Sequence, residues 1–139
     1  MDSYHGTSIN IAIELTNGKV DVSSGGGELG KGFYTGTFLH EAKAWAFQRY
    51  GDKKKNVVHF LTLDTDIDVL KYIILENNLA NYYCYKIKTS SQTRTYLFYL
   101  DMVWAPIVGS ARPKGDQYKW ESKRAECLLN SNKTNKKVI

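Results

Sequence analysis

A glycine-rich segment, residues 18–30, limits the regular structure that the N-terminal part of this chain can form. It contains Ser-Ser-Gly-Gly-Gly at residues 23–27, and glycine loses more backbone freedom than any other residue when a helix or strand fixes it. The residues that follow, Gly-Phe-Tyr-Thr at 32–35, are typical of a short strand. We therefore expect a loop over residues 18–30 that leads into a strand.

The rest of the pattern predicts an α+β domain with many short strands and two or three helices, rather than alternating βαβ units. Residues 4–6 end a first strand, and residues 9–15 are compatible with either a strand or a short helix. We expect further strands at residues 56–63, 82–88, 93–100, 102–108 and 117–121. Pro106 within one of them predicts a bend or a sheet edge.

Three segments have the capping residues and apolar spacing of helices. Thr37 is the expected N-cap of a helix at residues 38–50, which Gly51 ends. Asp66 or Asp68 caps a helix that continues through residues 70–75, and Ser122 caps a last helix that reaches residue 129. Residues 1–130 are therefore expected to form one domain, and the polar residues 131–139 a frayed, flexible tail.

The composition is that of an ordinary globular protein, since 42% of the 139 residues are hydrophobic and 24% are charged. No apolar run is long enough to cross a membrane, and the first residues lack the basic and apolar regions of a secretion signal. We therefore expect a cytoplasmic protein without a membrane partner. Cys84 and Cys127 lack the spacing of a metal or redox site, which predicts free thiols and no metal.

The formal net charge is +5, with lysines grouped at residues 53–55 and again in the tail at Lys133, Lys136 and Lys137. A basic domain favours polyanionic partners, and nucleic acid above all. Solvated loops explain such lysines equally well, so the charge does not by itself establish a partner.

Three local features carry polar groups suited to chemistry. His5-Gly6 places a side chain that can donate a hydrogen bond to a ligand beside a backbone that a planar ligand can approach closely. Gly30-Lys31-Gly32 is a glycine-flanked turn, although no Ser or Thr follows the lysine as a P-loop requires. Asp116-Gln117-Tyr118 opens the late strand. Taken singly, each is better explained by a structural role.

Taken together, these features resemble the poly(ADP-ribose) polymerase-like ADP-ribosyltransferases, which have the diphtheria-toxin-type fold and a signature of His, Tyr and Glu on three strands. The chain is also similar to a small bacterial family of uncharacterised ADP-ribosyltransferase-like domains. The likeness runs over residues 4–128 and rests on four segments: Tyr-His-Gly-Thr (4–7), Leu-Gly-Lys-Gly-Phe-Tyr (29–34), Ala-Lys-Ala-Trp-Ala (42–46) and Asp-Met-Val-Trp-Ala-Pro (101–106). It implies split antiparallel sheets with flanking helices around an NAD cleft.

The resemblance also implies roles for single residues, with NAD⁺ as co-substrate. His5 would hydrogen-bond the 2′-hydroxyl of the adenosine ribose, and the backbone of Gly6 would hold the nicotinamide carboxamide. Tyr34 would stack on the nicotinamide ring, and Trp45 would either stack on its other face or be a core residue of its helix. The implied NAD-binding set is His5, Gly6, Thr7, Gly32, Tyr34 and Trp45.

The third signature position departs from the family pattern, because Gln117 stands where the family has its glutamate. His5, Tyr34 and Gln117 are thus the implied catalytic residues. Glutamine keeps the hydrogen bond to the ribose but lacks the charge that stabilises an oxocarbenium-like transition state. This argues for single transfer and against polymer synthesis. Glu121 could supply a carboxylate, although a solvated glutamate is the simpler interpretation.

The function implied is that of a mono-ADP-ribosyltransferase, acting as a bacterial toxin or phage-defence effector with a possible antitoxin or inhibitor protein. The acceptor is expected to be nucleic acid, because the domain is basic and Lys119 and Lys123, near Gln117 in sequence, would form a basic surface beside it. A protein acceptor is the alternative. A catalytically weak module that binds NAD or ADP-ribose is the competing hypothesis, and Gln117 is its main support. Phosphate transfer from RNA 2′-ends to NAD ranks lower, because it relies on an arginine-rich site that this chain lacks.

Overall fold

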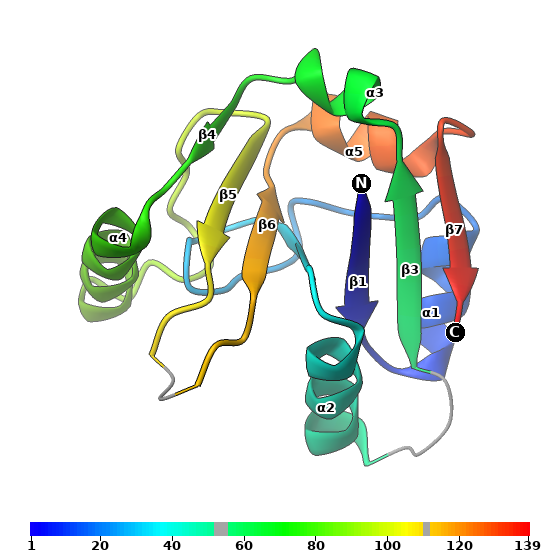
Figure 1. Cartoon of the computed structure of the whole chain (residues 1–139), viewed down its shortest axis with the longest axis horizontal. Coiled ribbons are helices and arrows are strands. Elements are labelled where there is room, and N and C mark those ends of the chain that lie inside the picture. The colour runs from blue at the N-terminus through cyan, green and yellow to red at the C-terminus, as the bar shows by residue number, and fades with distance from the viewer. Residues whose placement is uncertain (52–55, 110–111) are drawn as a thin grey trace.

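The computed structural model describes residues 1–51, 56–109 and 112–139, and this part of the chain is a mixed α+β structure (Figure 1). Seven strands and five helices occur in these ranges, where the sequence had predicted two or three helices. In chain order they are β1 (Asp2–Gly6), α1 (Ile9–Thr16), β2 (Phe33–Gly36), α2 (Leu39–Tyr50), β3 (Val57–Thr62), α3 (Asp64–Asp68), β4 (Tyr72–Ile74), α4 (Asn77–Thr89), β5 (Met102–Pro106), β6 (Asp116–Trp120), α5 (Lys123–Asn130) and β7 (Thr134–Val138).

The strands form one sheet in the order β4-β5-β6-β2-β1-β3-β7, and every neighbouring pair is antiparallel except β4 and β5. A single residue pair, Tyr4 with Gly36, joins β1 to β2. The sheet is therefore two strand groups, β4-β5-β6-β2 and β1-β3-β7, that meet at one point and diverge beyond it (Figure 1).

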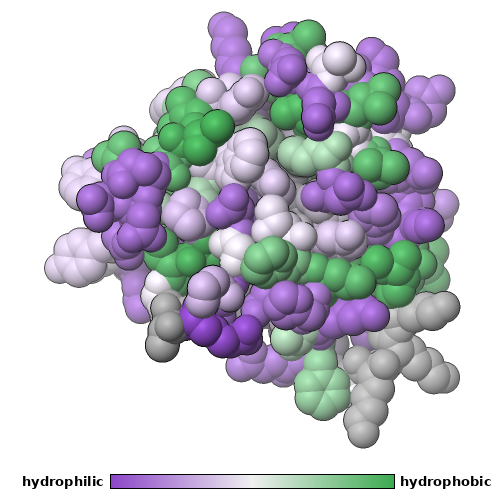
Figure 2. Space-filling view, in the orientation of Figure 1, coloured by the Kyte–Doolittle hydropathy of each residue, from purple (hydrophilic) through white to green (hydrophobic). Residues whose placement is uncertain are grey.

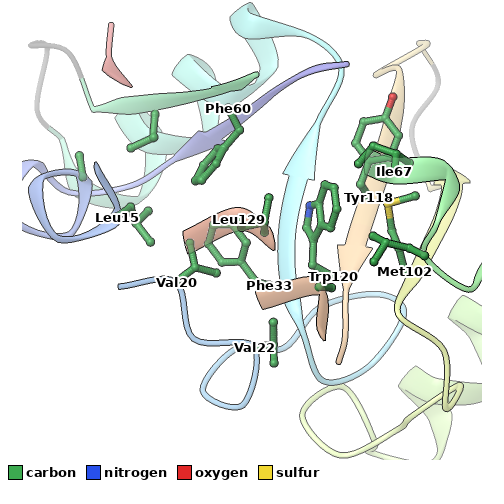
Figure 3. Close-up of a cluster of buried hydrophobic side chains, with 14 residues drawn as sticks. Leu15, Val20, Val22, Phe33, Phe60, Ile67, Met102, Tyr118, Trp120 and Leu129 are labelled. Atoms are coloured by element: carbon green, nitrogen blue, oxygen red, sulfur yellow. The ribbon is translucent and has the colours of Figure 1, made fainter. Parts of the chain in front are cut away.

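Two apolar clusters occupy opposite faces of this sheet. Phe33 and Trp120 belong to the larger one, which the helices α1 and α5 cover and which is drawn in Figure 3. The indole N–H of the fully buried Trp120 donates to the Thr35 hydroxyl at 3.0 Å, so its polar group is satisfied. Val103 and Ala105 point to the other face and pack with residues of α4 in the second cluster.

Several predicted boundaries are confirmed. Residues 18–30 contain no helix or strand, and residues 9–15 adopt the helical alternative as α1. Gly51 ends α2 in the left-handed conformation, with φ of +66°. The Ser122 hydroxyl accepts from the N–H of Ala125 at 3.1 Å and caps α5.

The predicted cap of α2 is wrong. Phe38 occupies the N-cap position and makes no side-chain capping bond. The Thr37 hydroxyl instead accepts from the backbone N–H of Asp116 at 2.9 Å, which ties the start of α2 to the start of β6.

Residues 82–88 lie in the helix α4, not in a strand, and residues 93–100 form no strand either. Glu76 caps α4 by accepting from the N–H groups of Asn78 and Leu79, and Ala80 and Ile87, seven residues apart, are the buried positions. The alternation of aromatic and polar residues that suggested strands reflects tyrosines exposed on this helix.

Two other predictions fail near the ends of the sheet. The helix expected through residues 70–75 is replaced by the short helix α3 and the strand β4, because Tyr72, Ile73 and Ile74 pair with β5. The tail expected to be flexible contains β7, an edge strand paired with β3 from Val138 to Thr134. Its lysine-rich sequence is common on exposed sheet edges, where charge discourages association with other chains.

Candidate functional site

The backbone of Gly6 faces β2 beyond Tyr4, the residue of β1 that pairs with β2, and we call this part of the sheet the opening between β1 and β2. The N–H of Thr7 donates to the carbonyl of Asn56 on the β3 side at 2.7 Å. Hydrogen-bonding directions alternate along an antiparallel strand, so the N–H and C=O of the preceding Gly6 point the opposite way, toward β2. The β1–β2 ladder contains only the pair Tyr4–Gly36, and Gly6 therefore has no ladder partner on β2.

The His5 imidazole bridges the two strands at this opening. Its Nδ1 lies 2.6 Å from the carbonyl oxygen of Tyr34, and its ring centroid lies 4.5 Å from that of Phe33. A carbonyl only accepts, so Nδ1 carries the hydrogen. Burial lowers the pKa of His5, which keeps the ring neutral near pH 7 and leaves Nε2 as an acceptor. The sequence had suggested that His5 donates to a ligand, whereas this tautomer accepts.

Close packing accounts for the glycines that the sequence singled out. A Cβ on Gly6 would lie 2.1 Å from the carbonyl oxygen of Ala42, so only glycine lets α2 cross β1 here. A Cβ on Gly32 would lie 2.9 Å from the carbonyl oxygen of Trp120. Thr7 is buried beside Gly6. These side-chain positions face the protein, and Gly6, Thr7 and Gly32 are all buried.

Tyr34 holds the glycine-rich loop against the sheet. Its hydroxyl donates to the carbonyl of Gly30 at 2.5 Å and accepts from the N–H of Leu29 at 3.1 Å. One face of its ring is covered by Gly27, where a Cβ would lie 2.7 Å from the ring. Burial raises the pKa of Tyr34 well above its usual range, so the hydroxyl stays protonated. The residue has a structural function that the sequence did not indicate.

Gln117 shares a sheet face with Tyr34 and is 7% exposed. Its Nε2 donates to Oε2 of Glu28 at 2.9 Å and lies 3.5 Å from the carbonyl of Pro106. The same Glu28 oxygen lies 3.8 Å from the thiol of Cys84, whose pKa burial and this carboxylate raise to about 12. Sequence reasoning missed Glu28, and its only signal was an acidic residue standing alone between residues 22 and 40.

Glu121 is not the solvated glutamate that the sequence suggested. Its carboxylate lies 2.6 Å from the ammonium of Lys119, and both side chains are almost completely buried. It also accepts from the N–H groups of Phe98 at 2.9 Å and Tyr99 at 2.7 Å. These contacts occupy Glu121 in a structural ion pair and leave Glu28 as the carboxylate beside Gln117.

Trp45 is a surface residue of α2, with 56% of its area exposed, so the interpretation as a core residue is wrong. The buried position of α2 is the neighbouring Ala46. The guanidinium of Arg49 lies 5.9 Å from the Trp45 ring. Figure 2 shows several hydrophobic patches on the otherwise mostly hydrophilic face seen in Figure 1.

The expected basic surface near Gln117 is smaller than the sequence suggested. Lys119 is buried, and Lys123 is exposed but pairs with Glu126 at 2.8 Å. Residues 53–55 lie outside the described residues.

Comparison with protein-family models and with curated proteins gives no match for this sequence. Within the described ranges, no three His, Cys, Asp or Glu side chains form a group that could hold a metal ion. No helix in these ranges has the length and apolar character needed to cross a membrane. The contacts of His5, Gly6, Gln117 and Glu28 are therefore the observations from which a function can be inferred.

Proposed function

We propose that this chain binds NAD⁺ where β1 and β2 separate and acts as a mono-ADP-ribosyltransferase. The observation that carries the proposal is the position of Gly6 and His5 at this opening. The N–H and C=O of Gly6 are complementary to a primary carboxamide, which has N–H donors and one C=O acceptor, and nicotinamide carries such a group. Nε2 of His5 is an acceptor for a ribose hydroxyl, which by the resemblance is the 2′-hydroxyl of adenosine.

Two aromatic side chains flank the proposed nicotinamide position. Tyr34 lies across the opening from Gly6 and would stack through the ring face that Gly27 does not cover. Trp45 is exposed on α2, the helix whose backbone passes over Gly6, and would cover the other face of the nicotinamide.

In the proposed reaction the bond between nicotinamide and ribose C1′ breaks, and its electron pair leaves with nicotinamide. An acceptor oxygen or nitrogen then forms the new bond to C1′ and loses its proton. Oε1 of Gln117 would accept a hydrogen bond from a hydroxyl of the ribose as positive charge develops there. Fixed dipoles aimed at developing charge supply a large part of catalysis in many enzymes.

We propose nucleic acid as the acceptor, supported by the net charge of +5. Lys119 no longer supports this choice, because a buried ammonium cannot contact a polyanion. Binding to nucleic acid releases counterions, so label transfer to RNA or single-stranded DNA should fall steeply with salt. Label that remains on protein after complete nuclease digestion would identify a protein acceptor instead. A cytoplasmic toxin or defence role, with an inhibitor protein, is the biological setting that fits such an activity.

A non-catalytic NAD- or ADP-ribose-binding module is the second candidate, and the uncharged amide of Gln117 favours it. Both candidates predict NAD⁺ binding, whereas only the enzyme releases nicotinamide. Incubation of the purified protein with NAD⁺ and separation of free nicotinamide therefore distinguishes the two.

The substitution His5→Asn tests the binding site most selectively. Asparagine can keep a donor close to the Nδ1 position for the Tyr34 carbonyl, but it has no counterpart of Nε2. We expect NAD⁺ binding measured by calorimetry to weaken by about 1–3 kcal/mol, as expected for a lost hydrogen bond in a desolvated site. His59→Gln is the matched control, because His59 lies on β3, on the other side of β1 from β2, and pairs with Asp2. Equal affinity of His5→Asn and the parent would contradict the site.

A further inference from the structure

The amide of Gln117 has a defined orientation. Its Nε2 faces two groups that only accept, the Glu28 carboxylate at 2.9 Å and the Pro106 carbonyl at 3.5 Å. The hydrogen-bond network therefore places the amide nitrogen on that side and Oε1 on the other. In the described part of the chain Oε1 has no hydrogen-bond partner, so it remains able to accept from a ligand.

Backbone hydrogen bonds of the residues before and after Glu28 hold this part of the loop in place. The N–H of Gly27 donates to the carbonyl of Thr93 at 3.0 Å, and the N–H of Leu29 donates to the Tyr34 hydroxyl at 3.1 Å. The backbone that carries Glu28 is thus fixed before any ligand arrives, although Glu28 is an exposed residue of a loop 89 residues away from Gln117 in sequence. Preorganised charges of this kind need no rearrangement during a reaction.

We propose that Glu28 is the positioning residue of this site and supplies, through Gln117, the negative charge that Gln117 lacks. The inference rests on the proposed function. The carboxylate orients the amide and polarises it, which makes Oε1 a stronger acceptor for the ribose hydroxyl. Its charge also stabilises the positive charge that develops on the ribose as nicotinamide leaves. No proton is transferred to Glu28 in this role.

Charge can be separated from hydrogen bonding by exchanging the two residues. Glu28→Gln keeps an oxygen that accepts from Gln117 but removes the charge. The double variant Glu28→Gln/Gln117→Glu again pairs one amide with one carboxylate, in the opposite order. Glu14→Gln is the matched control, because Glu14 is exposed on α1 and its side chain makes no hydrogen bond or ion pair among the described residues.

The readouts are kcat and KM for nicotinamide release, together with the NAD⁺ dissociation constant from calorimetry. For Glu28→Gln we expect kcat to fall about tenfold or more while KM and the dissociation constant stay within about twofold of the parent. The double variant should recover most of the lost kcat. A merely structural role would instead change binding or melting temperature and would not be rescued by the exchange.

A parent-like kcat for Glu28→Gln, or a double variant no more active than Glu28→Gln, would overturn this inference while leaving the proposed function intact. A parent protein that neither binds NAD⁺ nor releases nicotinamide would overturn both.

Discussion

Gln117 and Lys119 lie two residues apart on the same face of β6, and each pairs with a glutamate outside the strand. The two pairs differ in which polar atoms remain without a partner. Lys119 and Glu121 are both almost fully buried, and backbone N–H groups take up the remaining capacity of the carboxylate. Gln117 and Glu28 also form a hydrogen bond, but Oε1 of Gln117 has no partner in the described residues. A saturated pair, in which every polar atom has a partner, stabilises a fold. An open pair, in which one acceptor has no partner, is suited to a ligand.

The largest expected effect on stability is at the saturated pair. Lys119→Met leaves the Glu121 carboxylate buried without its cation, which should lower the free energy of unfolding by about 3–5 kcal/mol. Urea denaturation measures this, and adding Glu121→Gln should recover part of the loss. A loss below about 1 kcal/mol would remove the distinction between the two pairs.

The open pair should respond in activity and not in stability. Gln117→Ala removes the group that accepts from the ribose in the transition state, so kcat for nicotinamide release should fall by about 100-fold. The unfolding free energy should change by about 1 kcal/mol or less, because water can replace the donor to the exposed Glu28 and the bond to the Pro106 carbonyl is long. Parental turnover in Gln117→Ala would show that Gln117 takes no part in the reaction.

Gln117→Glu alone is not expected to increase NAD⁺ hydrolysis by restoring a carboxylate, because Glu28 is already in contact with that position. Two adjacent carboxylates raise the pKa of one of them in the folded state. Since the folded state then binds more protons than the unfolded state, stability should be lost as the pH rises above about 4.3 and through the raised pKa. Thermal melts of this variant from pH 4 to 8 measure the trend, and a flat difference from the parent would contradict the contact.

A smaller effect is expected for Tyr34→Phe, which keeps the ring and loses the hydroxyl that holds the loop bearing Glu28. The unfolding free energy should fall by about 1–3 kcal/mol, because the N–H of the buried Leu29 loses its partner. If the Tyr34 hydroxyl is needed to position Glu28, kcat should fall as well. From the sequence, only a stacking role of the Tyr34 ring was expected. An unchanged kcat would mean that the loop keeps Glu28 in place without the hydroxyl.

The smallest expected effect is a dependence of stability on pH that comes from His5 and not from the Lys119–Glu121 or Gln117–Glu28 pair. Its pKa is lowered in the folded state, so below the ordinary value of 6.5 the unfolded state binds more protons and stability falls. The parent should therefore lose stability as the pH drops below about 6.5, relative to His5→Asn, and the difference should be constant above that pH. A constant difference from pH 8 to 5 would show that the His5 pKa is not lowered.

Local signals predicted the elements whose ends are marked in the sequence. Ser122 and Gly51 define helix ends through their own backbone neighbours, and the β-branched run at residues 57–62 pairs as a strand whatever its partner. Two of the mistaken elements, β4 and β7, depend on strands that are distant in sequence. Segments this short or this polar show too little hydrophobic periodicity for a strand to be predicted without knowledge of the strand it pairs with.

The residues of the candidate site were also predicted only where the signal was local in sequence. His5, Gly6 and Gln117 were found from motifs, whereas Glu28 was missed because its contact with Gln117 depends on where the glycine-rich loop folds back. Lys119 was expected on the surface because lysine usually is, and only the tertiary position of Glu121 shows why it is buried.

In the proposed complex the backbone of Gly6 receives a carboxamide at the opening between β1 and β2. Titration of ¹⁵N-labelled protein with nicotinamide and with NAD⁺, followed by amide NMR, tests it most directly. We predict that both ligands shift the Gly6 N–H resonance, and that Gly109, in the loop after β5, stays unchanged. Binding of NAD⁺ that leaves the Gly6 resonance in place would contradict the claim, as would the absence of any shift at saturating NAD⁺.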